Sequence, residues 1–144
     1  MCNNPVGLGD RAGAIFIDLL CCGIPLYIIS YLIFGNTNEL FYNLFSNLYY
    51  VLVPTLWYGY TIGKKFAGIR IVKKDGSQVG ILTMIMREFV GHTLYLLTFG
   101  IGYIVSIFMV FIREDKRAIH DFIAGTYVTY DKPEKLEDWQ AEGA

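Results

Sequence analysis

The chain has 144 residues, a length that corresponds to one domain. Hydrophobic residues make up 54% of it without counting glycine, whereas soluble domains have about 45–50% with glycine included. A formal net charge of -1 gives no basic field for a nucleic-acid backbone, and 16% aromatic residues argue against disorder. These values leave a small apolar globule or a membrane protein.

Two apolar stretches make up most of the first half of the chain. They cover residues 12–35 and 40–62 and are separated by a polar turn at residues 36–39. Neither stretch contains Lys or Arg, and Asp18 is their only carboxylate. Each has the roughly 20 residues that a helix needs to cross a bilayer. The pattern predicts two transmembrane helices joined by a tight turn, with Gly63 ending the second.

A third apolar stretch, residues 80–112, is longer than one crossing needs. The glycines at Gly100 and Gly102 favour a break within it. We expect a helical hairpin with arms at residues 81–98 and 103–112. The second arm is short for a full crossing, so a re-entrant or interfacial hairpin stays open, as does one long tilted helix.

Basic residues near the ends of these segments predict the orientation. The turn at residues 36–39 has no Lys or Arg. Five bases follow the second helix and five follow the third stretch: Lys64, Lys65, Arg70, Lys73 and Lys74, then Arg113, Lys116, Arg117, Lys132 and Lys135. By the positive-inside rule the turn is outside, and the N-terminus, the loop at residues 63–80 and the C-terminus are cytoplasmic. The sequence thus predicts a multi-pass protein of the plasma (inner) membrane, with the lipid bilayer as its partner.

Two short segments outside the apolar stretches have strand character. Alternation over residues 69–73 and a β-prone run at residues 126–130 predict two cytoplasmic strands that pair into a ribbon. The expected fold class is therefore an all-α membrane protein with a short β-ribbon, in one domain over residues 1–130. The acidic tail at residues 131–144 is expected to be a mobile end.

Asp18 is a carboxylate inside the first predicted helix. It follows Arg11 by seven residues, two helical turns along the same face. A charge at the centre of a membrane helix costs about 2.5–3.5 kcal/mol on insertion scales, so it needs a partner. Arg87 and His92 on the third stretch, or Arg11 itself, are the candidates. Two interpretations stay open: an ion or proton site, or a charge pair that fixes the helix register.

Arg87, Glu88 and His92 form a second polar group in the third stretch. Glu88 and His92 are four residues apart and can hydrogen-bond on one helix face. Arg87 and Glu88 can equally be anchors at the membrane interface. Two metal ligands without a third make no metal site, so we expect no metal and no cofactor.

Asp121 ends a segment of dense mixed charge that begins at Arg113. Its carboxylate can cap backbone N–H groups or pair with Arg11 or Arg70. The sequence contains no Ser/His/Asp set, phosphate loop or CxxC pair, so no enzymatic activity is expected.

Three ordered motifs resemble those of the RDD family of small membrane proteins, which is named for one Arg and two Asp. The first helix is similar to the R-x-x-A-x-x-I-D element of the family, with Arg11, Ala14, Ile17 and Asp18. The second helix and the loop after it resemble its G-K-x-x-x-G-x-R-V element, with residues 57–61, Gly63, Lys64, Gly68, Arg70, Val72 and Gly76. The closing run resembles its D-x-x-A-G-T-x-V element, with Asp121, Ala124, Gly125, Thr126 and Val128.

This resemblance implies that Arg11, Asp18 and Asp121 are the residues for which the family is named. It also implies transport of ions or small solutes, because Na+/H+ exchange is associated with some members. A buried carboxylate suits exchange of a monovalent cation for a proton, since it can bind either in turn. A chain this short, without inverted repeats, would transport as a homo-oligomer. The alternative is a non-transporting scaffold or partner subunit whose Arg/Asp set is structural.

Overall fold

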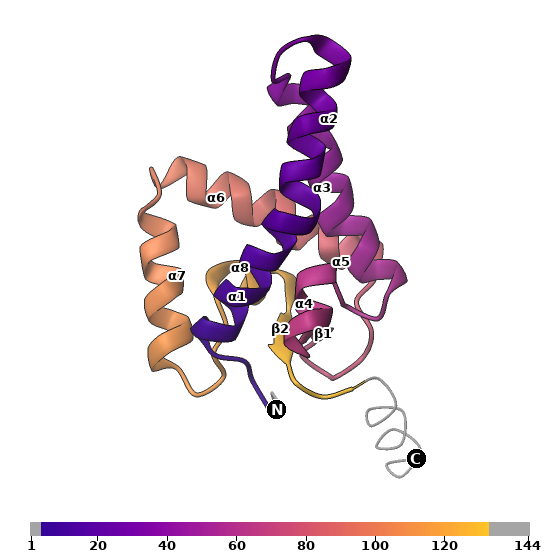
Figure 1. The fold of residues 1–144 in the computed structure, drawn as a ribbon. Coiled ribbons are helices and arrows are strands. Elements are labelled where there is room, and N and C mark those ends of the chain that lie inside the picture. The colour runs from indigo at the N-terminus through magenta and orange to yellow at the C-terminus, as the bar shows by residue number, and fades with distance from the viewer. Residues whose placement is uncertain (1–3, 133–144) are drawn as a thin grey trace.

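The computed structural model describes residues 4–132, which are mostly helical with one two-stranded sheet (Figure 1). The tail predicted at residues 131–144 lies outside the described residues except for its first two. In Figure 1 the turn between α2 and α3 is at one end of the molecule, and the strands and the first described residues are toward the other.

The first helix is continuous from Leu8 to Phe34 and 27 residues long. It consists of α1 (Leu8–Asp18), a π-helical turn η1 (Leu19–Gly23) and α2 (Ile24–Phe34). Its length and composition are those of a membrane span, and only 11% of its most apolar window is buried within the protein. A core helix of a soluble protein would be mostly buried, so this helix needs lipid or another chain to cover it.

The second predicted helix is correct only as far as Leu56. Helix α3 (Glu39–Leu56) begins at Asn38, whose side chain accepts a hydrogen bond from the Phe41 N–H at 3.1 Å. The prediction of helix to residue 62 is wrong, because Tyr58 and Gly59 have positive φ angles of 53° and 88°. A Cβ on Gly59 would lie 1.9 Å from the Ile71 carbonyl oxygen, so only glycine fits this turn.

A separate short helix, α4 (Ile62–Ala67), follows the turn. Thr61 caps it by accepting a hydrogen bond from the Lys64 N–H at 3.3 Å. Gly63 therefore lies near the beginning of a helix, and the prediction that it ends the preceding one is wrong. The sequence pattern missed this restart because residues 57–61 contain no charged side chain that would mark the end of the apolar stretch.

The third apolar stretch is broken where its glycines predicted. One arm contains α5 (Ile81–Ile85), a π-helical turn η2 (Met86–Val90) and α6 (Gly91–Leu97), and the other is α7 (Ile101–Ile112). The helix axis bends by 120° between the arms, with Phe99 and Gly100 at positive φ. One long straight helix is excluded, and the arms diverge from the antiparallel arrangement of a tight hairpin.

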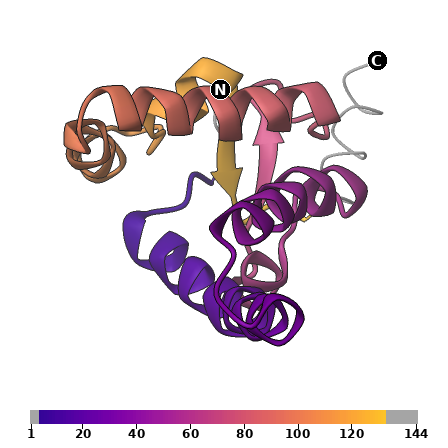
Figure 2. The ribbon, with the colours of Figure 1, turned by 90° about the horizontal axis from the view of Figure 1, so that it is seen from above.

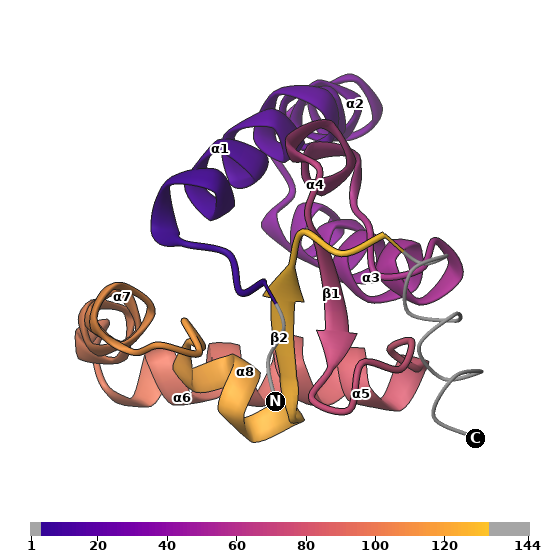
Figure 3. The ribbon, with the colours of Figure 1, turned by 90° about the horizontal axis from the view of Figure 1, so that it is seen from below.

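The predicted pairing of the two short strands is confirmed. Strands β1 (Arg70–Lys73) and β2 (Thr126–Thr129) are antiparallel, with Ile71 opposite Val128. Helix α8 (Ile119–Ala124) leads directly into β2. Seen along the long axis of the molecule, the ribbon lies between α1 and α4 on one side and α5 and α6 on the other (Figures 2 and 3).

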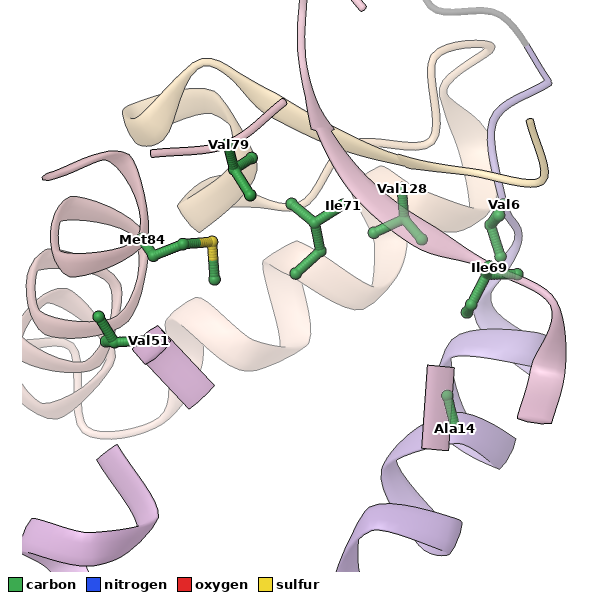
Figure 4. Close-up of a cluster of buried hydrophobic side chains, with 8 residues drawn as sticks. All are labelled: Val6, Ala14, Val51, Ile69, Ile71, Val79, Met84 and Val128. Carbon is green, nitrogen blue, oxygen red and sulfur yellow. The ribbon is translucent and has the colours of Figure 1, made fainter. Parts of the chain in front are cut away.

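The hydrophobic core surrounds this ribbon (Figure 4). Its members come from both strands and from the elements on either side of them: Val6, Ala14, Val51, Ile69, Ile71, Val79, Met84 and Val128. Because the ribbon is packed between helices, it has the support that two isolated strands lack.

Candidate functional site

Asp121 on α8 is bound between two arginines from distant parts of the chain. Arg11 Nη1 lies 2.8 Å from Asp121 Oδ2, and Arg87 Nε lies 3.0 Å from Oδ1. The carboxylate is fully buried, and the two guanidinium groups are nearly so. This cluster therefore ties α1 and η2 to α8.

Further hydrogen bonds fix both ends of this cluster. Arg11 Nε donates to the Val6 carbonyl at 3.2 Å, and its Nη2 donates to the Lys116 carbonyl at 2.6 Å. Asp121 Oδ2 also accepts from the Ala118 N–H at 3.2 Å, which caps the beginning of α8. The cluster leaves little freedom for Asp121 to change partners.

The charge of Asp121 is stabilised where it lies. Burial alone would raise the pKa of Asp121, but the charges of Arg87 and Arg11 outweigh burial and hold the pKa of this carboxyl well below its usual value. Asp121 is therefore a permanent anion at physiological pH.

His120 connects this cluster to α6 through a hydrogen bond with Tyr95. Its Nε2 lies 3.1 Å from Arg87 Nη2, and its Nδ1 lies 2.7 Å from Tyr95 Oη. Because a guanidinium only donates, Nε2 accepts and Nδ1 carries the ring proton. Burial, and next the charge of Arg87, lower the pKa of His120 to about 4. The imidazole is thus neutral near pH 7.

Asp18, at the end of α1, has three neutral hydrogen-bond donors. Its Oδ1 accepts from Tyr49 Oη and from the Gly63 N–H, both at 2.8 Å, and its Oδ2 accepts from Thr61 Oγ1 at 2.6 Å. The side chain is fully buried. The carboxylate thereby accepts the hydrogen bond of a backbone N–H in the first turn of α4, and it joins α1 to α3 and α4.

The contact between α1 and α4 depends on the absence of a side chain at residue 63. A Cβ on Gly63 would lie 2.0 Å from the Ala14 carbonyl oxygen and 2.9 Å from Asp18 Cγ. The backbone of α4 can therefore approach Asp18 only because residue 63 is glycine.

The structure places the three principal candidate residues in two separate centres. Asp121 pairs with Arg11, one of the two partners that the sequence suggested for this carboxylate. Asp18 instead accepts hydrogen bonds from Tyr49 and Thr61. The expectation that Asp18 pairs with Arg87, His92 or Arg11 is wrong. Arg87 and Arg11 are held by Asp121, and α4 fills the space beside Asp18.

The secondary candidates are dispersed. Glu88 lies 3.9 Å from Arg87 at the edge of the cluster, while His92 is exposed. The predicted Glu88–His92 contact is absent from the part of the chain that the structure describes, because the wider π-helical turn changes the register between these residues. Arg70 donates to the carbonyl oxygens of Asp131 and Tyr58 rather than to Asp121. Over residues 4–132, no three His, Cys, Asp or Glu side chains are grouped as metal ligands.

Thr61 and His120 lie within the family motifs, but sequence reasoning missed the hydrogen-bonding roles of Tyr49, Thr61 and His120. Thr61 could have been found, because Thr before Ile62-Gly63-Lys64 is a helix N-cap pattern. Tyr49 and His120 carry no local signal of their roles, since both contacts join residues far apart in the sequence.

Comparison with known sequences agrees with these motifs. The sequence model of the RDD family matches residues 5–125. The chain is 48% identical to the uncharacterized protein YckC of Bacillus subtilis (strain 168), over 93% of this chain and 90% of that protein. It is 36% identical to the uncharacterized membrane protein YteJ of the same organism, over 59% of this chain and 49% of that protein. No solved structure matches the chain.

Proposed function

Because the chain belongs to the RDD family, we propose that it is an integral membrane scaffold or partner subunit whose Arg/Asp set is structural. One observation carries this proposal: both family carboxylates are fully buried with their oxygens already hydrogen-bonded. A cation or proton carrier needs a carboxylate that can release its protein partners. These two instead join helices to one another, so the proposed role includes no enzymatic step.

We propose a multi-pass arrangement in the plasma membrane. The bridge between Pro5 and Thr129 brings the first described residues to the end of the ribbon. Basic residues are concentrated near this end and are absent from residues 36–39. This distribution supports a cytoplasmic N-terminus, a cytoplasmic loop over residues 63–80, and an outer turn.

Exchange of a monovalent cation for a proton at Asp18 is the competing function. The observation in its favour is that Asp18 lies within the first helix, at Leu8–Phe34, without a cationic partner among its described hydrogen bonds. A homo-oligomer would then have to supply the pathway.

Liposomes that contain the purified protein and a trapped pH dye distinguish the two functions. Under the structural proposal, pulses of Na+, K+ or Li+ produce no more pH change than in protein-free liposomes. Asp18→Asn lowers the free energy of unfolding by about 1–3 kcal/mol, because an amide cannot accept all three hydrogen bonds. The matched control Asp10→Asn, at an exposed position of the same helix, changes stability by less than about 1 kcal/mol, because its exposed hydrogen bond from Tyr130 Oη can still be accepted by the amide oxygen. A cation-driven pH change that Asp18→Asn abolishes would establish the exchanger instead.

A further inference from the structure

A cavity of about 310 Å³ lies between α1 and α7. Three cationic side chains line it: Arg11, Lys64 and Arg87. Within residues 4–132, no Asp or Glu is among its lining residues, because Asp121 lies behind the arginines. The cavity wall is therefore positively charged, although the chain as a whole has a net charge of -1.

Lys64 is the part of this wall that the two carboxylate centres do not use. Its side chain is only 9% exposed, and no hydrogen bond or ion pair from the described residues reaches its Nζ. Burial, and next the charge of Arg87, lower the pKa of Lys64 to about 8, so the group is still mainly an ammonium at pH 7. No buried side-chain nitrogen or oxygen of the described residues lacks a hydrogen-bond partner, so this Nζ faces the open cavity rather than the protein interior. An anion in the cavity would give the ammonium a charge-assisted partner.

The arginines retain N–H groups for the same anion. Arg11 uses one N–H of each of its three nitrogens within the protein, which leaves one on Nη1 and one on Nη2. Among the described residues, Arg87 Nη1 is approached by Glu88 Oε1 at 3.9 Å and donates no hydrogen bond. Three cationic groups with unused donors around one space suit a phosphate better than a single lysine does.

The mouth of the cavity is apolar. Ile15 of α1 and Ile107 of α7 line it and are 58% and 47% exposed. Both belong to helices whose outward residues are apolar, the surface that a bilayer would cover. A ligand with an anionic group and an alkyl chain matches both parts. The volume is at the lower end of the roughly 300–1,000 Å³ usual for ligand sites, which suits a headgroup and the first carbons of its chains.

We propose that this cavity binds the phosphate of an anionic phospholipid at Lys64, Arg87 and Arg11, with an acyl chain leaving between Ile15 and Ile107. The site rests on the membrane location in the proposed function. It does not depend on whether Asp18 is structural, so a positive result in the liposome exchange assay would leave it intact.

Native mass spectrometry of the full chain in neutral detergent tests the site. The probes are phosphatidylglycerol, phosphatidylcholine and inorganic phosphate, each titrated separately. We expect one phosphatidylglycerol to bind in preference to phosphatidylcholine. Lys64→Met weakens that binding by about tenfold or more, the effect of losing a charge-assisted hydrogen bond. The matched control Lys65→Met leaves binding unchanged, because Lys65 is exposed and lies against the Tyr60 ring, 4.4 Å from its centroid.

Thermal stability gives a second readout that a merely structural lysine would not produce. Without lipid, Lys64→Met should be about as stable as wild type, because the ammonium has no hydrogen-bond acceptor among the described residues. With phosphatidylglycerol, wild type should gain more in Tm than the variant, since only wild type keeps the ammonium. If Lys64→Met fails to fold, Ile107→Trp obstructs the mouth at a half-exposed position and should also reduce lipid binding.

Three results would overturn the proposal. The first is equal affinity for phosphatidylglycerol and phosphatidylcholine. The second is unchanged phosphatidylglycerol binding in both Lys64→Met and Ile107→Trp. The third is binding of inorganic phosphate as tight as that of phosphatidylglycerol, which would make the ligand a soluble anion rather than a lipid.

Discussion

Asp121 holds two buried guanidinium groups, so its loss would leave two buried charges without their partner. We expect Asp121→Asn to lower the free energy of unfolding in detergent by about 3–5 kcal/mol, the usual cost of breaking a buried ion pair. Thermal or denaturant unfolding of the purified protein measures this change.

The control for Asp121 is the Arg113–Asp115 pair, which has a comparable distance of 2.9 Å but lies at the surface. Asp115→Asn should cost less than about 1 kcal/mol, because solvent screens this pair. Equal losses in the two variants would show that Asp121 is not the structural centre of the cluster.

His120 makes stability depend on pH. Because burial and Arg87 hold the pKa of His120 at about 4, below its ordinary value of 6.5, the unfolded chain binds a proton between these pH values that the folded chain does not. Its contribution to stability is complete above pH 6.5 and is lost progressively as the pH falls toward 4. The carboxyl of Asp121, whose folded pKa is also lowered, adds a loss below its ordinary pKa of about 3.9.

We therefore expect the Tm of the wild-type protein to fall between pH 6.5 and 4, and His120→Gln to reduce this slope. His92→Gln is the matched control, since His92 is exposed and lies outside the cluster. A slope that is the same in His120→Gln as in wild type would contradict the assignment of a buried neutral imidazole.

At the scale of elements, the crossing of α1 and α4 holds the Asp18 centre together. The Cβ introduced by Gly63→Ala would meet the Ala14 carbonyl oxygen, which belongs to backbone and cannot rotate away. We expect a loss of about 1–3 kcal/mol or more from this overpacking. Unfolding measurements should show the loss together with weakened protection of the Gly63 amide in hydrogen exchange.

Gly13→Ala on α1 is the matched control for this substitution. A Cβ on Gly13 has no heavy atom within 4 Å, so the change should be neutral or stabilising through helix propensity. If both alanine variants were equally stable, the close approach of α4 would not be what positions Asp18.

Local sequence patterns were sufficient to predict the first helix, the break in the third apolar stretch and the first strand. Apolar length predicted the first helix, the glycines at residues 100 and 102 predicted the break, and the alternation at residues 69–73 predicted a strand. The early end of α3 was not predictable in this way, because Ile71, a residue far along the chain, requires the turn at Gly59.

The sequence predicted which charged residues belong to the site, but it did not predict which residues contact one another there. Arg11, Asp18 and Asp121 stand out as charges in or beside apolar segments. The partners of Asp18 are a hydroxyl pair and a backbone amide, which carry no charge for a pattern to detect. Arg87 binds Asp121 because the bent third stretch brings η2 to α8, a tertiary arrangement that spacing does not encode.

At the scale of the whole molecule, the two carboxylate centres and the ribbon gather the first described residues, α4 and α8 into one unit, while the turn after α2 projects away from it (Figure 1). If the first helix crosses the bilayer, this turn and the ribbon must face opposite compartments. In the orientation proposed above, the ribbon faces the cytoplasm, because basic residues are concentrated around it.

Cysteine labelling in cells tests this arrangement, in a background where Cys2, Cys21 and Cys22 are replaced by Ser or Ala. Asn36→Cys and Lys74→Cys place single thiols at exposed positions of the outer turn and of the loop after β1. We expect a membrane-impermeant maleimide to label Asn36→Cys in intact cells and Lys74→Cys only after permeabilisation. Labelling of both thiols in intact cells would mean that the Leu8–Phe34 helix does not separate two compartments, and the reverse pattern would invert the orientation. The first result would remove the bilayer surface from which a phospholipid reaches the cavity between α1 and α7. The second would move that cavity to the outer leaflet.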